Sequence, residues 1–131
     1  MENLTLIIPA KYESESLPDV LRELKKFNYN IFVVLKDTDL ETINSIKNFD
    51  IEIVYQKGTG YGNALIEGIK FCKTKYYCIF NADGSFNPNE IQSMMDRLNS
   101  NNNDFIFASR YEKNAGSEDD TFVTLVGNYI F

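Results

Sequence analysis

Short apolar runs alternate along this chain with stretches in which apolar residues recur every three or four positions. The runs span residues 4–8, 31–35, 51–55, 76–80 and 104–109. A run of this length, bounded by turn-forming residues, predicts a strand that is buried on both faces. Such strands, separated by helices, predict an α/β domain whose central sheet is mostly parallel and is covered on both sides.

The stretches between the runs predict the helices. Apolar residues at positions 17, 20, 21 and 24 share one helical face, and Ser16 before them is a candidate N-cap. Residues 87–90 also form a helix start, because Asn, Pro and Glu occupy the cap, first and third positions. Further helices are predicted at 40–48, through 65–72 and through 91–98.

A last helix, predicted to begin near Thr121, would be apolar over most of its circumference. Phe122, Leu125, Val126 and Tyr129 would form one stripe, which the apolar residues at 123 and 130 widen. A helix of this kind needs cover on more than one side. We expect that cover from a segment beyond residue 131, from a second subunit in a homo-oligomer, or from a membrane surface.

Composition excludes several chemistries. The 131 residues fit one domain, the net charge is −6, and histidine is absent. The acidic balance argues against nucleic acid as a partner, since a phosphate backbone binds a basic face. Without histidine, a metal must be held by oxygen ligands, which favours Mg²⁺ or Mn²⁺. Cys72 and Cys78 match no zinc or redox spacing, so we expect buried thiols in a cytoplasmic protein without a signal peptide.

Candidate functional residues follow from the predicted sheet, because ligands of such sheets bind at the carboxyl ends of the strands. The segments at these ends are 9–13, 36–39, 56–62, 81–85 and 109–112. In the fourth segment, Asp83 stands between Asn81 and Ser85. Three oxygen-bearing side chains suit a hard cation that bridges phosphates. The same residues are also compatible with a plain Asp-Gly turn.

Two other strand-end segments have both a binding interpretation and a structural one. Gly58, Gly60 and Gly62 precede a helix and could offer backbone N–H groups to a diphosphate. They could equally form a tight turn that lets the helix pack closely on the sheet. Glu13 could accept hydrogen bonds from the N–H groups of a base, or could place favourable charge near a helix N-terminus.

The segment after the fifth predicted strand contains three further candidates. Arg110 suits bidentate contact with phosphate, or a salt bridge to a nearby carboxylate. Asp119 and Asp120 precede the last predicted helix. One of them is expected to cap it, and the other could serve as a general base or bind an acceptor.

In order and spacing, these segments resemble family-2 glycosyltransferases of GT-A fold. The branch they resemble includes dolichyl-phosphate mannosyl- and glucosyltransferases and bacterial polyprenyl-phosphate and cell-wall glycosyltransferases. The segments that carry the resemblance are IIPAKYESE at 7–15, GYGNALIEGI at 60–69, NADGSFNPNEI at 81–91, and ASRY at 108–111 with AGS at 115–117.

The resemblance implies a Rossmann-like three-layer sandwich with a mostly parallel sheet. It also implies metal-dependent, inverting transfer of a sugar from a nucleoside-diphosphate sugar, such as GDP-mannose, to an acceptor, foremost a polyprenyl or dolichyl phosphate. Arg110, Asp119 and Asp120 are then the catalytic candidates. The implied donor-binding residues are Pro9, Ala10, Glu13, Asp37, Gly60, Gly62, Asn81, Ala82 and Asp83, and the metal-site residues are Asn81, Asp83 and Ser85.

Three departures from the family pattern stand out. Asn81 replaces the first aspartate of the metal motif, so that the site loses a charge. An aspartate pair that grips the nucleoside after the second strand is reduced to Asp37 or Asp39. Relatives continue past residue 131, so we expect an acceptor-side segment to be missing from this single GT-A domain of residues 1–131.

These departures keep two alternatives open. A GT-A domain that binds nucleotide without catalysis would fit Asn81 and the short C-terminus. A sugar-phosphate nucleotidyltransferase is also α/β and metal-dependent. It would show a glycine-rich basic loop after the first strand, where this chain has Ala-Lys-Tyr-Glu at 10–13.

Overall fold

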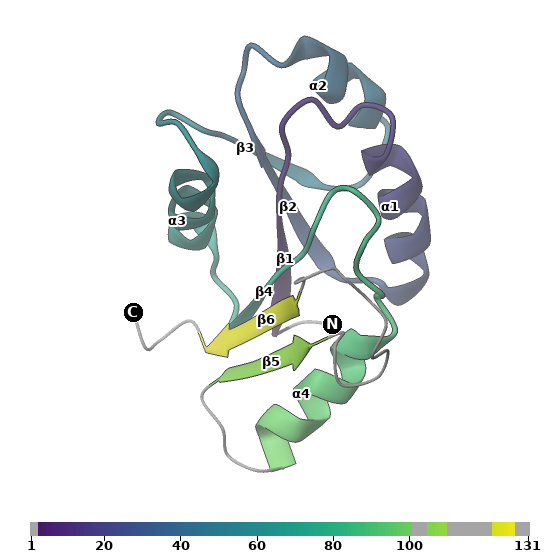
Figure 1. Ribbon diagram of the computed structural model, residues 1–131, viewed down its shortest axis with the longest axis vertical. Helices are drawn as coiled ribbons and strands as arrows, with labels where there is room; N and C mark the ends of the chain where they lie inside the picture. Colours follow the sequence, from purple (N-terminus) through teal and green to yellow (C-terminus); the bar gives the residue numbers. More distant parts are fainter. Residues whose placement is uncertain (1–2, 101–104, 110–121, 128–131) are drawn as a thin grey trace.

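Six strands in the described part of the computed structural model form one sheet in the order β3-β2-β1-β4-β6-β5 (Figure 1). The structure describes residues 3–100, 105–109 and 122–127. Strands β1 to β4 run parallel, whereas β6 is antiparallel to both β4 and β5. The strands are β1 Leu4–Pro9, β2 Asn30–Leu35, β3 Glu52–Tyr55, β4 Tyr76–Ile79, β5 Phe105–Ser109 and β6 Phe122–Gly127.

Helices cover both faces of this sheet, as the sequence predicts (Figure 1). Three helices, α1, α2 and α4, lie against one face, and among the described residues α3 lies alone against the other. The three-layer α/β sandwich with a mostly parallel sheet is therefore confirmed. The helices are α1 Leu17–Leu24, α2 Leu40–Ile46, α3 Tyr61–Phe71 and α4 Glu90–Ser100, and a short 3₁₀ helix, η1 Lys25–Phe27, follows α1.

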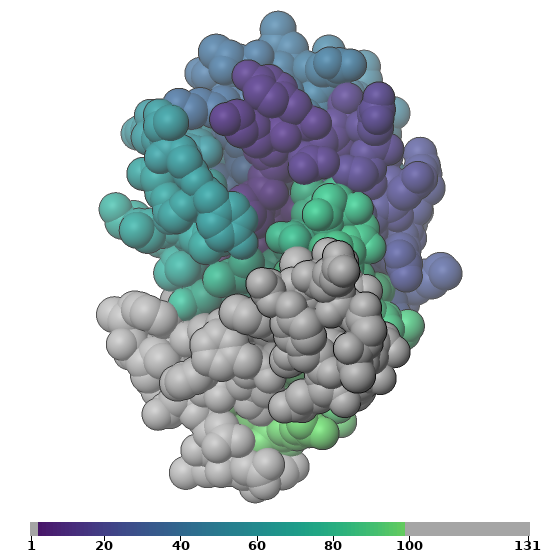
Figure 2. All heavy atoms as spheres, viewed as in Figure 1, coloured from purple at the N-terminus to yellow at the C-terminus, as the bar shows by residue number. Residues whose placement is uncertain are grey.

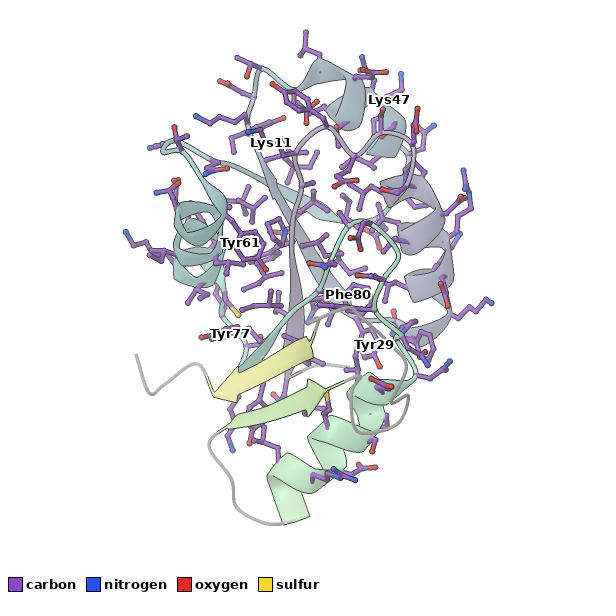
Figure 3. All side chains as sticks on the ribbon, viewed as in Figure 1. Lys11, Tyr29, Lys47, Tyr61, Tyr77 and Phe80 are labelled. Atoms are coloured by element: carbon purple, nitrogen blue, oxygen red, sulfur yellow. The ribbon has the colours of Figure 1, made fainter. Side chains whose placement is uncertain are left out.

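The continuous apolar runs of the inner strands fill two separate cores. Leu6 and Ile8 of β1 pack on the side of α1, while Ile7 between them packs on the side of α3. β4 shows the same alternation, with Tyr77 on the α3 side and Phe80, just after the strand, on the opposite side (Figure 3). A strand with apolar contacts on both faces needs no polar alternation, which is why these runs are unbroken.

Gly68 allows α3 to lie directly on β1 and β2. A Cβ atom at this position would stand 2.8 Å from Cγ2 of Ile7 and 2.9 Å from Cγ2 of Val34. Both distances are too short for a methyl group. The close helix–sheet contact considered for the glycines at 58–62 is thus made further along the helix, at Gly68.

The last predicted helix is wrong, because residues 122–127 form strand β6. Most of these residues are β-branched or aromatic, and such a run fits a buried strand as well as a buried helix. Pairing decides between the two: Leu125 lies opposite Cys78 of β4 on one side and Ile106 of β5 on the other. The expectation of cover from a membrane or a second subunit was based on a helix, so that argument does not apply to residues 122–127.

The two cysteines are buried and free, as the sequence predicts. Burial raises the pKa of the Cys78 thiol, so that thiol stays protonated at neutral pH. In the described residues, no helix has both the length and the apolar character needed to cross a membrane.

Candidate functional site

A cleft of about 600 Å³ opens where the parallel strands end. The segment after β1, the start of α3 and the turn after β4 border the same hollow (Figure 2). Segments after all four parallel strands contribute side chains, as expected for a sheet of this kind. The lining residues are Pro9, Ala10, Lys11, Tyr12, Glu13, Lys36, Thr38, Asp39, Gln56, Thr59, Gly60, Tyr61, Ala64, Asn81, Ala82 and Asp83.

The loop after β1 is fastened to α2 by Asp39. Tyr12 has a φ of 55°, a left-handed conformation that a bulky residue rarely adopts. Its backbone N–H donates to Oδ2 of Asp39 at 2.9 Å, and Oδ1 of the same carboxylate accepts from the N–H of Thr42 at 3.4 Å. Asp39 is only 7% exposed. This carboxylate caps α2 and holds the loop, so its two oxygens are already engaged by the protein.

Glu13 and Ser16 connect this loop to the turn after β4. The Ser16 hydroxyl lies 2.8 Å from Oε2 of Glu13 and 2.8 Å from the carbonyl oxygen of Ala82. A hydroxyl has one proton, so the two acceptors share it. Ser16 occupies the N-cap of α1 as predicted, but its side chain makes no capping hydrogen bond. Its hydroxyl instead positions the two walls of the cleft relative to each other.

The carboxylate of Glu67 in α3 accepts hydrogen bonds from the backbone at the start of the glycine-rich loop. It accepts from the N–H of Lys57 at 3.0 Å and from that of Gly58 at 2.9 Å. These two hydrogen bonds, the one from Lys57 first, lower the pKa of Glu67. The Gln56 amide donates to the Gly60 carbonyl and to Oδ1 of Asn63, each at 2.9 Å. The loop is therefore held internally, and two of its N–H groups are unavailable to a diphosphate.

The turn after β4 is built so that it presents oxygen atoms. Oδ1 of Asp83 accepts from the N–H of Ser85 at 2.9 Å, and the Asn81 amide nitrogen donates to the Ser85 hydroxyl at 3.2 Å. Gly84 has a φ of 83°, which lets the chain reverse here. Among the described residues, no hydrogen bond reaches Oδ2 of the exposed Asp83 or Oδ1 of Asn81. Both atoms are free to accept a ligand.

The oxygen atoms of this turn fit a cation that also binds phosphate. Within the described residues, no cluster of three or more His, Cys, Asp or Glu side chains could hold a metal ion. A site with one carboxylate, Asp83, and a neutral amide oxygen does not form a complete protein cage. Mg²⁺ is commonly held by one or two carboxylates together with substrate phosphates and water. The donor set therefore fits Mg²⁺ or Mn²⁺ that is shared with a ligand.

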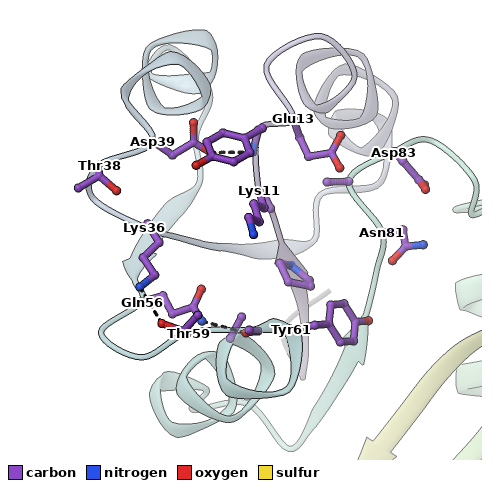
Figure 4. Close-up of a pocket in the computed structure, with 16 residues that line it drawn as sticks. Lys11, Glu13, Lys36, Thr38, Asp39, Gln56, Thr59, Tyr61, Asn81 and Asp83 are labelled. Atoms are coloured by element: carbon purple, nitrogen blue, oxygen red, sulfur yellow. Dashed lines mark hydrogen bonds between the residues drawn. The ribbon is translucent and has the colours of Figure 1, made fainter.

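Cationic and aromatic side chains complete the cleft (Figure 4). The Lys36 ammonium donates to the Thr59 hydroxyl at 3.2 Å, and the Lys11 ammonium lies 5.9 Å from the centre of the Tyr12 ring. Tyr61 stands at the start of α3. Partial burial raises the pKa of its phenol, which keeps it neutral at physiological pH.

Most of the predicted site residues that the structure describes meet in this cleft. Three predicted residues, Asp37, Gly62 and Ser85, do not line it. Of the two aspartates after β2, Asp39 lines the cleft, whereas the predicted donor-binding residue is Asp37. The predicted residues that line it are Pro9, Ala10, Glu13, Gly60, Asn81, Ala82 and Asp83. The catalytic candidates Arg110, Asp119 and Asp120 lie outside the described residues.

Several residues that line the cleft were not among the predicted site residues. No binding role was predicted for Lys11, Tyr12, Lys36 or Thr59, yet each lies in a segment that directly follows a strand. The rule that such segments form the site finds them. Tyr61 lies in the glycine-rich segment and begins α3.

The fold and cleft define a GT-A domain of the Rossmann-like class. Over residues 5–130 the chain matches Glycosyl transferase family 2, and it belongs to this family. A curated relative, an uncharacterized protein of Methanocaldococcus jannaschii, is 26% identical over 133 residues, covering 98% of this chain and 55% of the relative. The chain thus spans about half the length of that relative.

Solved structures share the fold at low sequence identity. Mannosyl-3-phosphoglycerate synthase from Rubrobacter xylanophilus superposes with a TM-score of 0.79 at 15% identity, covering 98% of this chain and 54% of the enzyme. Glucosyl-3-phosphoglycerate synthase from Mycobacterium tuberculosis, in complex with Mn²⁺, uridine diphosphate and phosphoglyceric acid, gives a TM-score of 0.70 at 13% identity. That match covers 98% of this chain and 57% of the enzyme.

Proposed function

We propose that this chain binds a nucleoside-diphosphate sugar together with Mg²⁺ or Mn²⁺ and serves as the donor-binding domain of an inverting glycosyltransferase. The observation that carries the proposal is the exposed Asp83 carboxylate, which has a free oxygen at the edge of a cleft formed by strand ends. Family membership supports the reaction class. The Mn²⁺ and uridine diphosphate bound to the mycobacterial enzyme support the ligand and the metal.

In this proposal, different residues of the cleft bind the cation, the diphosphate and the nucleoside. Asp83 and Asn81 would hold the cation, and Ser85 would keep both side chains oriented. The cation would neutralise the diphosphate as it leaves. Pro9 and Glu13 would border the nucleoside, where the fixed loop after β1 forms the wall of the cleft.

Transfer would proceed by attack of the acceptor on the sugar C1 from the face opposite the diphosphate, which inverts that centre. We propose a polyprenyl or dolichyl phosphate as the acceptor, on the basis of the sequence resemblance. A phosphate acceptor is already anionic and needs no strong base. A sugar hydroxyl would need one, for which Asp119 and Asp120 are the candidates. Arg110 would stabilise charge on a donor or acceptor phosphate.

Titration calorimetry with UDP and GDP tests the donor site. We expect Mn²⁺ to tighten binding of one of these nucleotides to the wild-type chain by at least tenfold. Asp83→Ala should abolish this gain, because the turn then has no carboxylate for the cation. Asp50→Ala removes an exposed carboxylate outside the cleft and should retain the gain.

Two results would contradict the proposal. If neither nucleotide binds with Mn²⁺, with Mg²⁺ or without metal, the cleft is not a donor site. Alternatively, Asp83→Ala could respond to Mn²⁺ as the wild type does, which would place the cation elsewhere. A chain that binds nucleotide and metal as expected but transfers no sugar would support the non-catalytic alternative.

A further inference from the structure

Among the described residues, two lysine side chains in the cleft have no carboxylate partner. Lys11 and Lys36 both line it, and the chain as a whole is acidic, with a net charge of −6. Within the described residues, the salt bridge found joins Arg22 to Asp19 on the surface of α1, and neither cleft lysine takes part in one. Each has a neutral contact instead: Lys36 with the Thr59 hydroxyl, and Lys11 with the Tyr12 ring.

The two lysines follow neighbouring strands. Pro9 of β1 lies in register with Val34 of β2, and the N–H of Ala10 donates to the Val34 carbonyl at 2.9 Å. Lys11 and Lys36 each come two residues after this registered pair. Both lysines therefore enter the cleft from neighbouring strand ends, so that two positive charges are presented on its lining.

Among the described residues, no carboxylate forms an ion pair with Lys11 or Lys36. The Asp39 carboxylate accepts from two backbone N–H groups, and Glu13 accepts from the Ser16 hydroxyl. In the glycine-rich loop, Glu67 already accepts from the N–H groups of Lys57 and Gly58, so these two groups are not available to an anion. The lysines are thus the cationic donors in the cleft that remain available to a ligand.

Charge balance at the metal turn points to the same ligand. A divalent cation at Asp83, with the neutral Asn81 beside it, leaves one net positive charge. A nucleoside-diphosphate sugar carries roughly two negative charges, one on each phosphate. A lysine ammonium can neutralise the remainder, and in Figure 4 Lys11 extends into the cleft between Asp39 and Asp83.

We propose that Lys11 and Lys36 form a phosphate-binding pair that holds the nucleotide directly, so that part of its affinity does not depend on metal. The pair compensates for the single carboxylate of the metal turn. This inference rests on the proposed function, since it concerns how the same cleft holds its nucleoside diphosphate.

The test is calorimetry with UDP and GDP in EDTA, at low and high NaCl. The wild-type chain should bind in EDTA, and its affinity should fall as salt rises, since the contact is ionic. Lys11→Met and Lys36→Met keep most of the aliphatic stem and remove the charge. Each should lose about tenfold in affinity, the size expected of one charged hydrogen bond.

Matched variants separate loss of phosphate contact from loss of structure. Lys47→Met removes the same charge at the end of α2, away from the cleft (Figure 3), and should bind as the wild type does. Lys11→Arg and Lys36→Arg keep the cation and should retain the salt-dependent affinity, and circular dichroism confirms that each variant is folded.

The inference fails if the wild type binds only with Mn²⁺, or if the two methionine variants bind in EDTA as tightly as the wild type. Either outcome leaves the proposed donor site intact. Absence of nucleotide binding under every condition, with and without metal, is the separate result that removes the proposed function and this inference together.

Discussion

The glycine-rich loop before α3 and the turn after β4 look alike but differ in what they leave free. Both connect the end of a parallel strand to a helix, and both contain a glycine with positive φ, Gly60 at 95° and Gly84 at 83°. In the loop, Glu67 and Gln56 hold the backbone. In the turn, the hydrogen bonds among the described residues leave one Asp83 oxygen open.

This difference shows that glycine content alone does not identify a phosphate-binding loop. A loop binds an anion through N–H groups that have no partner. Where a carboxylate of the same protein already accepts from them, as Glu67 does at Lys57 and Gly58, those N–H groups are closed to a ligand. The turn, with its unsatisfied acceptors, is the part suited to a cation.

Among substitutions in the loop and the turn, we expect the largest effect from Gly60→Ala, which should lower the free energy of unfolding by about 2 kcal/mol. Gly60 has φ 95° and ψ 164°, a backbone region that is essentially restricted to glycine. The loop must therefore rearrange to accept a Cβ atom. Urea denaturation measures the change.

Gly62→Ala is the control for that substitution. Gly62 lies in the first turn of α3, and a Cβ atom there would meet no other atom within 4 Å. Because alanine favours helix over glycine, this variant should be neutral or about 0.5 kcal/mol more stable. Equal effects at positions 60 and 62 would mean that the loop is not held in the conformation described.

The substitution Asn81→Asp tests whether the turn after β4 binds a cation. A second carboxylate beside Asp83 should tighten Mn²⁺ binding in the presence of UDP by about tenfold, or 1.4 kcal/mol, because affinity for hard cations rises with ligand charge. Calorimetric titration of Mn²⁺ gives the change. Asn89→Asp adds the same charge outside the cleft, and an equal gain there would indicate a general charge effect.

The smallest effect is a pH dependence that originates in the loop. The pKa of Glu67 is lowered in the folded chain from an ordinary value of 4.5. Its contribution to stability is therefore complete above that value and is lost as pH falls through the lower, folded value. Glu67→Gln should flatten the decline of the melting temperature below about pH 5.

Glu23→Gln, which removes an exposed carboxylate on α1, should leave that decline unchanged. If Glu67→Gln and the wild type lose stability in parallel on acidification, the carboxylate does not hold the loop.

Much of the fold was predictable because its signals are local. The inner strands are apolar on both faces, so the runs around Ile7 and Val33 stand out. The helix start at Asn87 is also confirmed in outline: its side chain accepts from the N–H of Asn89 at 3.0 Å, and α4 begins at Glu90. Such features depend on neighbours within a few residues.

Features that depend on distant partners were not predictable from the sequence. Residues 122–127 look helical until β4 and β5 are seen to pair with them. Likewise, nothing near Glu67 indicates that its carboxylate faces the N–H of Gly58, or that Asp39 rather than Asp37 lies in the cleft. The order of strand ends located the cleft, but the hydrogen bonds across it decide which of its groups remain free.

The position of β6 has a consequence for how the chain is made. β6 is the last strand described along the sequence, yet it fills the gap between β4 and β5. A chain emerging from the ribosome can assemble β1 to β4 with their helices while residues 122–127 are still being synthesised. During that interval β4 has an open edge and β5 has no neighbour, and open edges recruit strands from other chains. The nascent domain should therefore be most prone to aggregation just before β6 is synthesised.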